Sequence, residues 1–280
     1  MKNGIYDDLA EPDYHGATDA LSASGAKLLL PPSCPAKFRH RMDNPIHSDA
    51  FDLGHVAHRL VLGKGEEFVV IEADSWRTKD ARDARIAARA NGMTPILQAD
   101  YETAQRMALA VKEHAVAGSL FTDGKPEVSA FWTDGETGIQ RRARFDCLRN
   151  PIEGRRRIIA DLKTARSAEP VEFGRAAANY GYAIQAANYL DAAIALGLDP
   201  DPAFIFCVVE KEEPHVVTVA QLDDEAIRVG RALLRRALDI FATCRERDEW
   251  PGYATDVARL SLPPWFINNT DDYLASQEPV

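Results

Sequence analysis

The stretch Arg157-Ile158-Ile159-Ala160-Asp161-Leu162-Lys163 joins an apolar run to an acid and a base that stand two positions apart. The run predicts a buried β-strand, and side chains two apart on a strand point the same way. Asp161 and Lys163 therefore project together, while Leu162 turns towards the core. Burying two charges costs free energy that a bound cation and an anionic substrate can offset, which favours phosphodiester hydrolysis. An isolated Asp-x-Lys triplet, however, is usually a surface ion pair that contributes little.

Strand patterns on both sides of this triplet predict a sheet. Residues 127–133 and 139–148 alternate in strand fashion around the turn at 133–138, which indicates a hairpin that precedes the triplet strand. Residues 203–210 and 215–220 predict a second hairpin. Helices are expected between and after these strands, over residues 171–178, 182–196 and 223 to about 247.

The N-terminal part of the chain is expected to be mostly helical. Ser22 or Ser24 can cap a helix that reaches Leu30, and Pro31-Pro32 ends it. Further helices are predicted from about residue 35 and over 50–62, 80–91 and 100–117, with a short strand at 67–71. The order predicts an α/β (α+β) protein with a central mixed β-sheet flanked by helices. We expect one domain over 1–280, with a helical N-terminal elaboration (1–120), a catalytic core (121–248) and a tail (249–280).

Composition limits the class of protein. The chain has 280 residues, of which 46% are hydrophobic and 27% charged, which is ordinary for a globular protein. No run approaches the roughly 18 apolar residues of a membrane span, and the first residues lack the apolar stretch of a signal peptide. We therefore expect a cytoplasmic protein with no membrane partner. The four cysteines are widely scattered, so we predict free thiols and no iron–sulfur cluster.

Charge is distributed unevenly along the chain. The net charge of −10 argues against a protein coated in positive potential, the usual property of a non-specific nucleic-acid binder. The basic residues are nevertheless bunched, and a local basic groove on an acidic body can still bind a phosphate backbone. The alternative for any one bunch is a solvated face without a ligand.

Three further features can converge on the triplet. Asp146 ends the second strand, and a second carboxylate beside Asp161 forms an oxygen-rich site suited to magnesium or manganese. His58 lies one helical turn after Gly54, whose missing side chain allows a close approach. Gln185 and Tyr189 share a helical face after the triplet strand. Taken singly, each is more often a turn, core or surface residue.

Together these residues resemble a known family. Gly54-x-x-x-His58, Asp146, Asp161-x-Lys163 and Gln185-x-x-x-Tyr189 occur in the order, and on the element types, of the RecB-like branch of PD-(D/E)XK nucleases, which have a restriction-endonuclease-like core. The chain looks closer still to the RecE-like exodeoxyribonuclease VIII family. Segments that carry this similarity are Gly4-Ile5-Tyr6, Tyr14-His15, Leu21 to Ser24, Ser33 to Phe38, Phe51 to His58 and Tyr180 to Gln185.

The resemblance implies roles for individual residues. His58, Asp146, Asp161 and the Leu162 backbone carbonyl would ligate one or two Mg²⁺ or Mn²⁺ ions, and Glu127 could add a further carboxylate. Lys163 would orient the attacking water and stabilise the transition state, in agreement with general metal-ion and electrostatic catalysis. Gln185 and Tyr189 would position DNA or the nucleophile.

The basic bunches of the core are the predicted DNA contacts, which carry affinity without sequence information. Because side chains alternate along a strand, about half of each bunch can face DNA. Arg142 and Arg144 are expected on the face of Asp146 and are the better candidates. The others are Arg141, Arg155 and Arg157.

RecE-like enzymes digest linear double-stranded DNA from its 5′ ends as homo-oligomeric rings, and they work with a RecT-type annealing protein. The resemblance therefore implies double-stranded DNA ends, such an annealing protein and further copies of the chain as partners, in recombination or phage DNA processing. Two alternatives stay open. One is another RecB-like nuclease, either an endonuclease or an enzyme of CRISPR adaptation, and the other is a catalytically silent DNA-binding module of the same fold.

Overall fold

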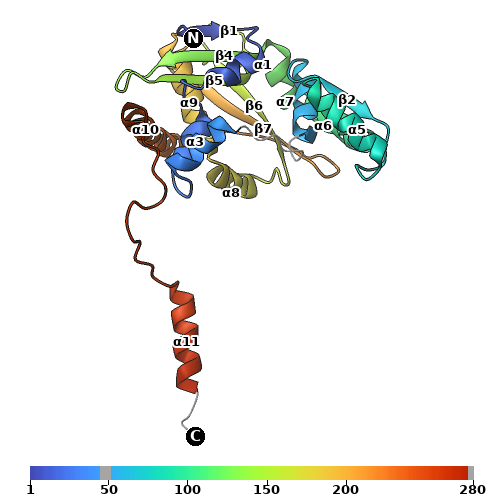
Figure 1. Cartoon of the computed structure of the whole chain (residues 1–280). Coiled ribbons are helices and arrows are strands. Elements are labelled where there is room, and N and C mark those ends of the chain that lie inside the picture. Colours follow the sequence, from blue (N-terminus) through green and yellow to red (C-terminus); the bar gives the residue numbers. More distant parts are fainter. Residues whose placement is uncertain (45–51, 277–280) are drawn as a thin grey trace.

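The computed structural model describes residues 1–44 and 52–276, and its centre is a six-stranded sheet (Figure 1). β6 and β7 are parallel, and the other neighbouring strands are antiparallel. Helices flank this mixed sheet, so the predicted fold class is confirmed. In spatial order the strands are β1 (Gly4–Tyr6), β4 (Gly124–Thr133), β5 (Gln140–Arg149), β6 (Ile158–Ala165), β7 (Ala203–Glu210) and β8 (Val217–Ala220).

Helices cover both faces of the sheet. On one face α4 (Asp52–Leu62), α6 (Gln98–Glu113) and α7 (Ala117–Thr122) share a core with Leu162 and with two buried cysteines, Cys147 and Cys207. On the other face α8 (Pro170–Tyr180) and α9 (Tyr182–Ala195) pack on Phe145, Phe204 and Phe206. A further helix, α10 (Asp224–Arg247), packs on the outer side of α9.

The alternation predicted for the triplet strand is present in β6. Ala160 and Leu162 pack in the core beneath α4 and α6, whereas Ile159 packs in the core beneath α8 and α9. Asp161, which is fully buried, lies on the Ile159 face. The sheet thus presents its carboxylate to α9, which carries Gln185.

Several elements were not predicted, or begin or end at residues other than those predicted. β3 (Thr94–Leu97), which contains a proline, pairs in parallel with β2 (Phe68–Ile71) in a separate sheet, and β1 has only three residues. The helix expected over 100–117 ends at Glu113, and α7 follows it separately. The helix predicted from residue 50 is α4, but residues 50 and 51 lie outside the described part. Ser22 caps α2 (Ala23–Leu29) as predicted, and the remaining N-terminal helices are α1 (Glu11–Gly16), α3 (Pro35–Asp43) and α5 (Lys79–Ala90).

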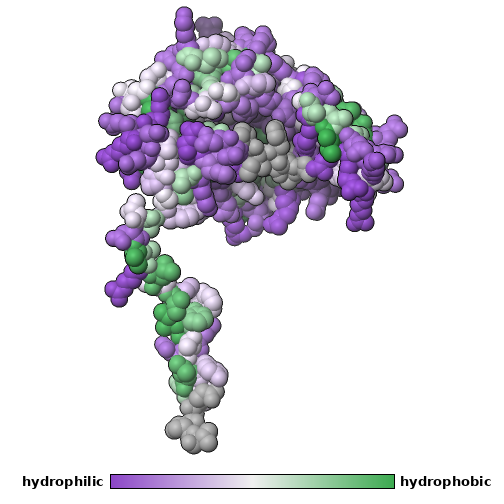
Figure 2. Space-filling model, in the orientation of Figure 1, coloured by the Kyte–Doolittle hydropathy of each residue, from purple (hydrophilic) through white to green (hydrophobic). Residues whose placement is uncertain are grey.

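The segment expected as a tail forms another helix, α11 (Pro264–Ser276), which stands apart from the sheet and its helices (Figure 1). None of the residues of α11 is buried. Figure 2 shows this segment as a run of apolar surface, to which Trp265, Phe266 and Leu274 contribute. Among the described helices, none has both the length and the apolar character that crossing a bilayer requires.

Replacing Gly230 by Ala is expected to lower the free energy of unfolding by about 1–3 kcal/mol, the usual cost of overpacking a core. A Cβ at Gly230 on α10 would lie 2.1 Å from the carbonyl oxygen of Ala183 on α9, so the two helices must separate. The matched control is Gly174→Ala on α8, where a Cβ meets nothing within 4 Å. This control is expected to gain about 0.5–1 kcal/mol from helix propensity. Urea unfolding measures both, and a Gly230→Ala variant as stable as the wild type would disprove the close packing.

Candidate active site

The site forms where β5 and β6 separate. Their ladder pairs Leu148 with Ile159 and Cys147 with Ala160, and it stops there. Leu162 lies beyond the last ladder pair with β5, and its backbone N–H donates to the side-chain oxygen Oδ2 of Asp146 over 2.7 Å. A buried backbone donor needs such a partner, so this bond fixes the Asp146 carboxylate against β6.

His58 reaches the same point from α4. Its Nδ1 lies 3.5 Å from Asp146 Oδ2, and its ring hydrogen-bonds the backbone of Leu162. A Cβ at Gly54 would lie 3.3 Å from the Thr164 side-chain oxygen, so the glycine lets α4 approach β6 closely. Gly54 thus allows α4 to pack closely on β6, and this packing places the His58 imidazole, one helical turn later, beside the Asp146 carboxylate.

Asp161 is held from two sides. Gln185 Nε2 on α9 donates to Asp161 Oδ1 over 2.7 Å, and Lys163 Nζ lies 2.5 Å from Asp161 Oδ2. The Oδ2 atom is buried and, despite this ion pair, lacks a hydrogen bond of acceptable geometry. Asp161 therefore keeps one buried carboxylate oxygen that is not fully satisfied.

Tyr189 packs between aromatic rings and does not face the cavity described below. Its ring makes edge contacts with Phe145 and Phe204, at centroid distances of 5.3 and 5.5 Å. Burial raises its pKa well above the ordinary value, and its hydroxyl interacts with the Gln185 side chain. In this structure Tyr189 is placed to support Gln185.

Burial also sets the protonation of the other groups. It lowers the pKa of His58 to about 4, so the ring is neutral and able to ligate a cation at neutral pH. Burial raises the pKa of Asp161 to about 6 and that of Asp146 in the same direction. Burial lowers the pKa of Lys163, but Asp161 and Asp146 raise it by more, so the ammonium stays charged. Two crowded carboxylates with raised pKa values are stabilised by an added cation.

Glu127 joins this group from β4. The β4–β5 register places it across from Asp146, between the pairs Pro126–Cys147 and Val128–Phe145. Its φ of 54° is in the left-handed region, which is unfavourable for a residue other than glycine. Burial, with the Asp146 charge next in size, raises the pKa of Glu127 to about 8, and its Oε2 lies 3.7 Å from Arg144 Nε.

In EDTA the free energy of unfolding of the wild type should fall as the pH is raised, and Glu127→Gln should make this fall smaller. The expected difference is of the order of a few kcal/mol, since one pKa unit is about 1.4 kcal/mol. The pKa of Glu127 rises from 4.5 to about 8 on folding, so between these values the folded chain binds more protons than the unfolded chain. The free energy of unfolding of the wild type therefore falls as pH rises through this range. Glutamine removes that contribution.

Urea unfolding in EDTA at about pH 5, near the lower end of this range, and at about pH 9, above it, measures the difference. The exposed Glu153→Gln is the control and should follow the wild type. A Glu127→Gln variant that loses as much stability as the wild type between the two pH values would show that Glu127 is not the destabilised carboxyl.

The fit of a metal ion to these residues follows from their chemistry. Among the described residues, no group of three or more His, Cys, Asp or Glu side chains is already arranged around one point. The carboxylates and the backbone carbonyl still suit a hard divalent cation, and the neutral imidazole of His58 can add a nitrogen ligand. Asp161 Oδ2, which is ion-paired with Lys163 but has no well-aligned hydrogen bond, supplies one candidate ligand atom. The chemistry of the predicted ligands His58, Asp146, Asp161 and Leu162 thus fits a divalent metal ion.

The predicted DNA-binding arginines are placed differently from the expectation. Arg141 is buried and bonds to Asn188 and Asp191, and Arg142 is buried with its guanidinium over Tyr14 and bonded to the Tyr14 carbonyl. Arg144 donates to the Leu9 carbonyl and to Ser129. Because internal groups occupy these guanidiniums, we correct the prediction and assign the three arginines to the packing of the N-terminal segment and α9.

Arg155 and Arg157 are also poorly placed for the site. They precede the first residue of β6, whereas the site lies towards its carboxyl end. With a rise of about 3.3 Å per residue, Arg157 is more than 10 Å along the strand from Asp161. The backbone N–H of Arg157 donates to Asp199, and neither arginine lines the cavity beside Lys163.

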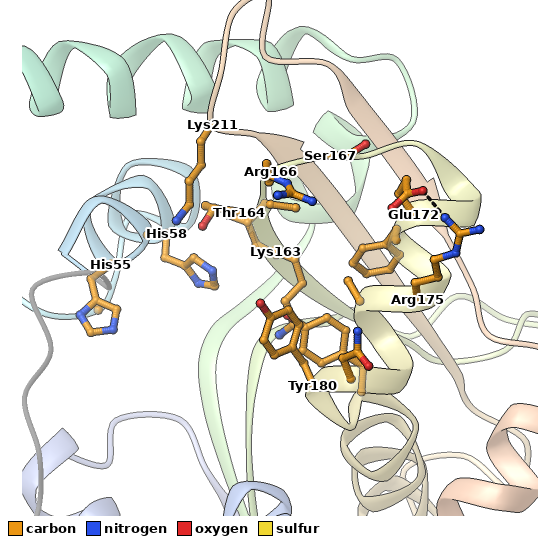
Figure 3. A pocket seen from close by; sticks show the side chains of 18 of the residues that line it. His55, His58, Lys163, Thr164, Arg166, Ser167, Glu172, Arg175, Tyr180 and Lys211 are labelled. Carbon is orange, nitrogen blue, oxygen red and sulfur yellow. Dashed lines mark hydrogen bonds and ion pairs between the residues drawn. The ribbon is translucent and has the colours of Figure 1, made fainter. Parts of the chain in front are cut away.

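A cavity of about 950 Å³ opens beside Lys163 (Figure 3). His55, which is ion-paired with Glu66, and His58 lie on one side of it, and α8 forms another wall. The sequence did not predict that α8 or the residues that follow β6 line the site. Tyr180 to Gln185 was noted only for its resemblance to the RecE-like family, and the polar spacing in Glu172 to Tyr180 is one that any surface helix shows. The wall residues used below are Arg166, Arg175, Tyr180, Tyr182 and Lys211.

Comparison with known proteins shows a family and similar solved structures. Residues 22–262 match the family described as PDDEXK-like domain of unknown function, DUF3799. The crystal structure of a candidate exonuclease from Eubacterium rectale is similar over 94% of this chain and 98% of its own, with a TM-score of 0.62 and 12% identity. At that identity the likeness shows a shared fold only.

The crystal structure of SSO0001 is 14% identical over 69% of this chain and 85% of its own, and its TM-score of 0.32 carries no weight. The curated proteins include no match.

Proposed function

The chain belongs to the DUF3799 family of PDDEXK-like domains, and from this premise we propose that it is a metal-dependent nuclease that hydrolyses phosphodiester bonds in DNA. The observation that carries the proposal is the meeting of His58, Asp146, Asp161 and Lys163 where β5 and β6 separate. Asp161 is buried, and the other three side chains are partly buried beside a cavity that His58 and Lys163 line. A silent module would have no need to keep charged groups at this desolvation cost.

Each residue has a role that follows from its contacts. His58, Asp146, Asp161 and the Leu162 carbonyl would hold the cation, and Gln185 fixes the Asp161 carboxylate through its 2.7 Å hydrogen bond. The bound cation lowers the pKa of water and neutralises charge on the phosphate. Lys163 keeps its proton, orients the attacking water and stabilises negative charge on the transferred phosphoryl group. Tyr189 positions Gln185 through the interaction of its hydroxyl with the Gln185 side chain. We propose Mg²⁺ or Mn²⁺ as the cation, because both are divalent and both bind carboxylate oxygens.

We further propose that the enzyme is an exonuclease that degrades linear duplex DNA from 5′ to 3′. The support is the RecE-like pattern of motifs and the candidate exonuclease with the same fold. A homo-oligomeric ring and a RecT-type partner rest on that resemblance alone. An acidic exterior around a basic channel would reconcile the net charge of −10 with DNA binding.

Labelled linear duplexes test the activity. With Mg²⁺ we expect loss of a 5′ label before a 3′ label, and we expect no cleavage in EDTA or on a closed circular duplex. Cleavage of the circle would identify an endonuclease instead. An absence of cleavage with Mg²⁺ and with Mn²⁺ on every DNA would contradict the proposed function. Gel filtration against the 30.9 kDa chain mass tests the ring.

A further inference from the structure

The charges around the cavity are divided between two sides. Glu11, Glu66 and Glu127 line the part near the two histidines. The negative charges of Glu11 and Glu66 would repel a phosphate backbone there unless a cation were present. The side formed by α8 and by the carboxyl ends of β6 and β7 is basic and aromatic instead. A nucleic-acid strand is therefore expected to approach the site along this second side.

Two cations on the basic side are free to bind phosphate. Arg166 follows β6 and Lys211 follows β7, and the Lys211 backbone N–H donates to the Ala165 carbonyl. Neither Arg166 nor Lys211 has a side-chain hydrogen bond or ion pair within residues 1–44 and 52–276. Four lysines and arginines and four glutamates line the cavity, and Arg166 and Lys211 are the two of these cations that have no ion pair among the described residues. Figure 3 shows both beyond Lys163, on the side away from Tyr180.

The helical wall adds an aromatic platform. Tyr180 ends α8 and is 60% exposed, and its ring lies 5.8 Å from that of Tyr182 with a tilt of 33°. Lys163 Nζ lies 5.0 Å from the centre of the Tyr182 ring, so the aromatic pair begins at the proposed catalytic ammonium. Lys27 Nζ lies 5.6 Å from the centre of the Tyr180 ring, so a further cation stands at this platform. Ala176, one helical turn before Tyr180, adds only a methyl group beside the ring.

The charged pair on α8 does not cancel this arrangement. Glu172 is ion-paired with Arg175, so its carboxylate is neutralised within the wall (Figure 3). A cavity of about 950 Å³ falls in the size range of pockets that enclose small molecules. Such a volume suits a few nucleotides of one strand.

We propose that the α8 wall is a subsite for single-stranded DNA, in which a base stacks on Tyr180 and the backbone phosphates contact Arg166 and Lys211. This inference rests on the proposed function and deepens it, because it states that the strand enters the site unpaired. Aromatic stacking together with a basic track is the general mode by which single strands are bound without sequence preference. Tyr180 is then a positioning residue for the strand to be cut.

Binding without catalysis tests the subsite. The full chain is titrated in EDTA against a fluorescein-labelled oligo(dT) of about 12 nucleotides and against a blunt duplex of the same length, with anisotropy as the readout. Tyr180→Ala is expected to weaken oligo(dT) binding about tenfold and to leave duplex binding unchanged. Tyr180→Phe keeps the ring and should bind as the wild type. Tyr273→Ala, which removes a 62% exposed tyrosine on α11, is the matched control and should also bind as the wild type.

A second variant tests the phosphate contacts. Arg166→Gln combined with Lys211→Gln should reduce the slope of log Kd against log salt by about 1.4, because each single-strand phosphate contact contributes about 0.7. Oligo(dT) binding by Tyr180→Ala within twofold of the wild type would overturn the proposal, as would an equal loss on the duplex or an unchanged salt slope. If the wild type binds oligo(dT) in this way but cleaves no DNA, the subsite stands and the nuclease assignment fails. If the wild type cleaves DNA but the variants bind oligo(dT) as it does, the nuclease assignment stands and the subsite fails.

Discussion

An Asp161→Asn variant is expected to lose DNA cleavage by a factor of about 1,000 or more, while the fold is retained. Asparagine has the shape of aspartate and can still accept from Gln185, but it removes the charge that would hold a cation beside Asp146. Loss of one group of this kind from a catalytic set typically costs about 10²–10³ in rate, and a lost cation costs more. Cleavage of labelled linear duplex at saturating Mg²⁺ measures the change.

Binding of Mn²⁺, followed by calorimetry without DNA, provides a readout other than activity. The variant should bind Mn²⁺ at least about tenfold more weakly than the wild type, because a charged ligand has become neutral. Asp272→Asn on the exposed helix α11 is the control and should leave both rate and affinity unchanged. Wild-type cleavage by Asp161→Asn would end the assignment of this site.

A Lys163→Met variant should cleave about 100- to 1,000-fold more slowly while it still binds Mn²⁺. Methionine fills the space of the aliphatic stem but lacks the ammonium that lies 2.5 Å from Asp161 Oδ2 and faces the cavity. The measurement needs about pH 8, because Asp161 has lost its cationic neighbour and its pKa, already about 6, rises further.

The exposed Lys79→Met on α5 controls for the general loss of a positive charge and should cleave at the wild-type rate. The two active-site variants are then separated by metal affinity, which Asp161→Asn loses and Lys163→Met retains. Equal loss of Mn²⁺ binding in both would mean that Lys163 supports the architecture of the metal site and does not act on the phosphate.

Local sequence was sufficient for the main strands and for the central motif. The apolar run before Asp161 is a buried strand in the structure. Side chains alternate along a strand, so the sequence alone shows which residues of β6 share a face. The class of sheet also followed from the order of the elements. Short or atypical elements escaped prediction, because β1 has too few residues for a pattern and β3 is interrupted by Pro95.

The arginines show why the binding surface could not be read in the same way. Arg141, Arg142 and Arg144 form a basic bunch in the sequence, but α1, α9 and the N-terminal segment supply carbonyls, Asn188 and Asp191 that take up their guanidiniums. These partners are far away in sequence, so no local pattern reveals them. Arg166 and Lys211 lack such partners among the described residues, although neither stands in a basic bunch.

The sequence by itself determined that a carboxylate and an ammonium share one face of a buried strand, because alternation along a strand is a property of the local backbone. Only the tertiary structure decided that His58 and Glu127 come to the same carboxylates, and that an acidic side and a basic, aromatic side border one cavity. The physical reason is that electrostatic contacts depend on distance through space, which for these residues is set by how α4, α8 and β4 pack on the sheet.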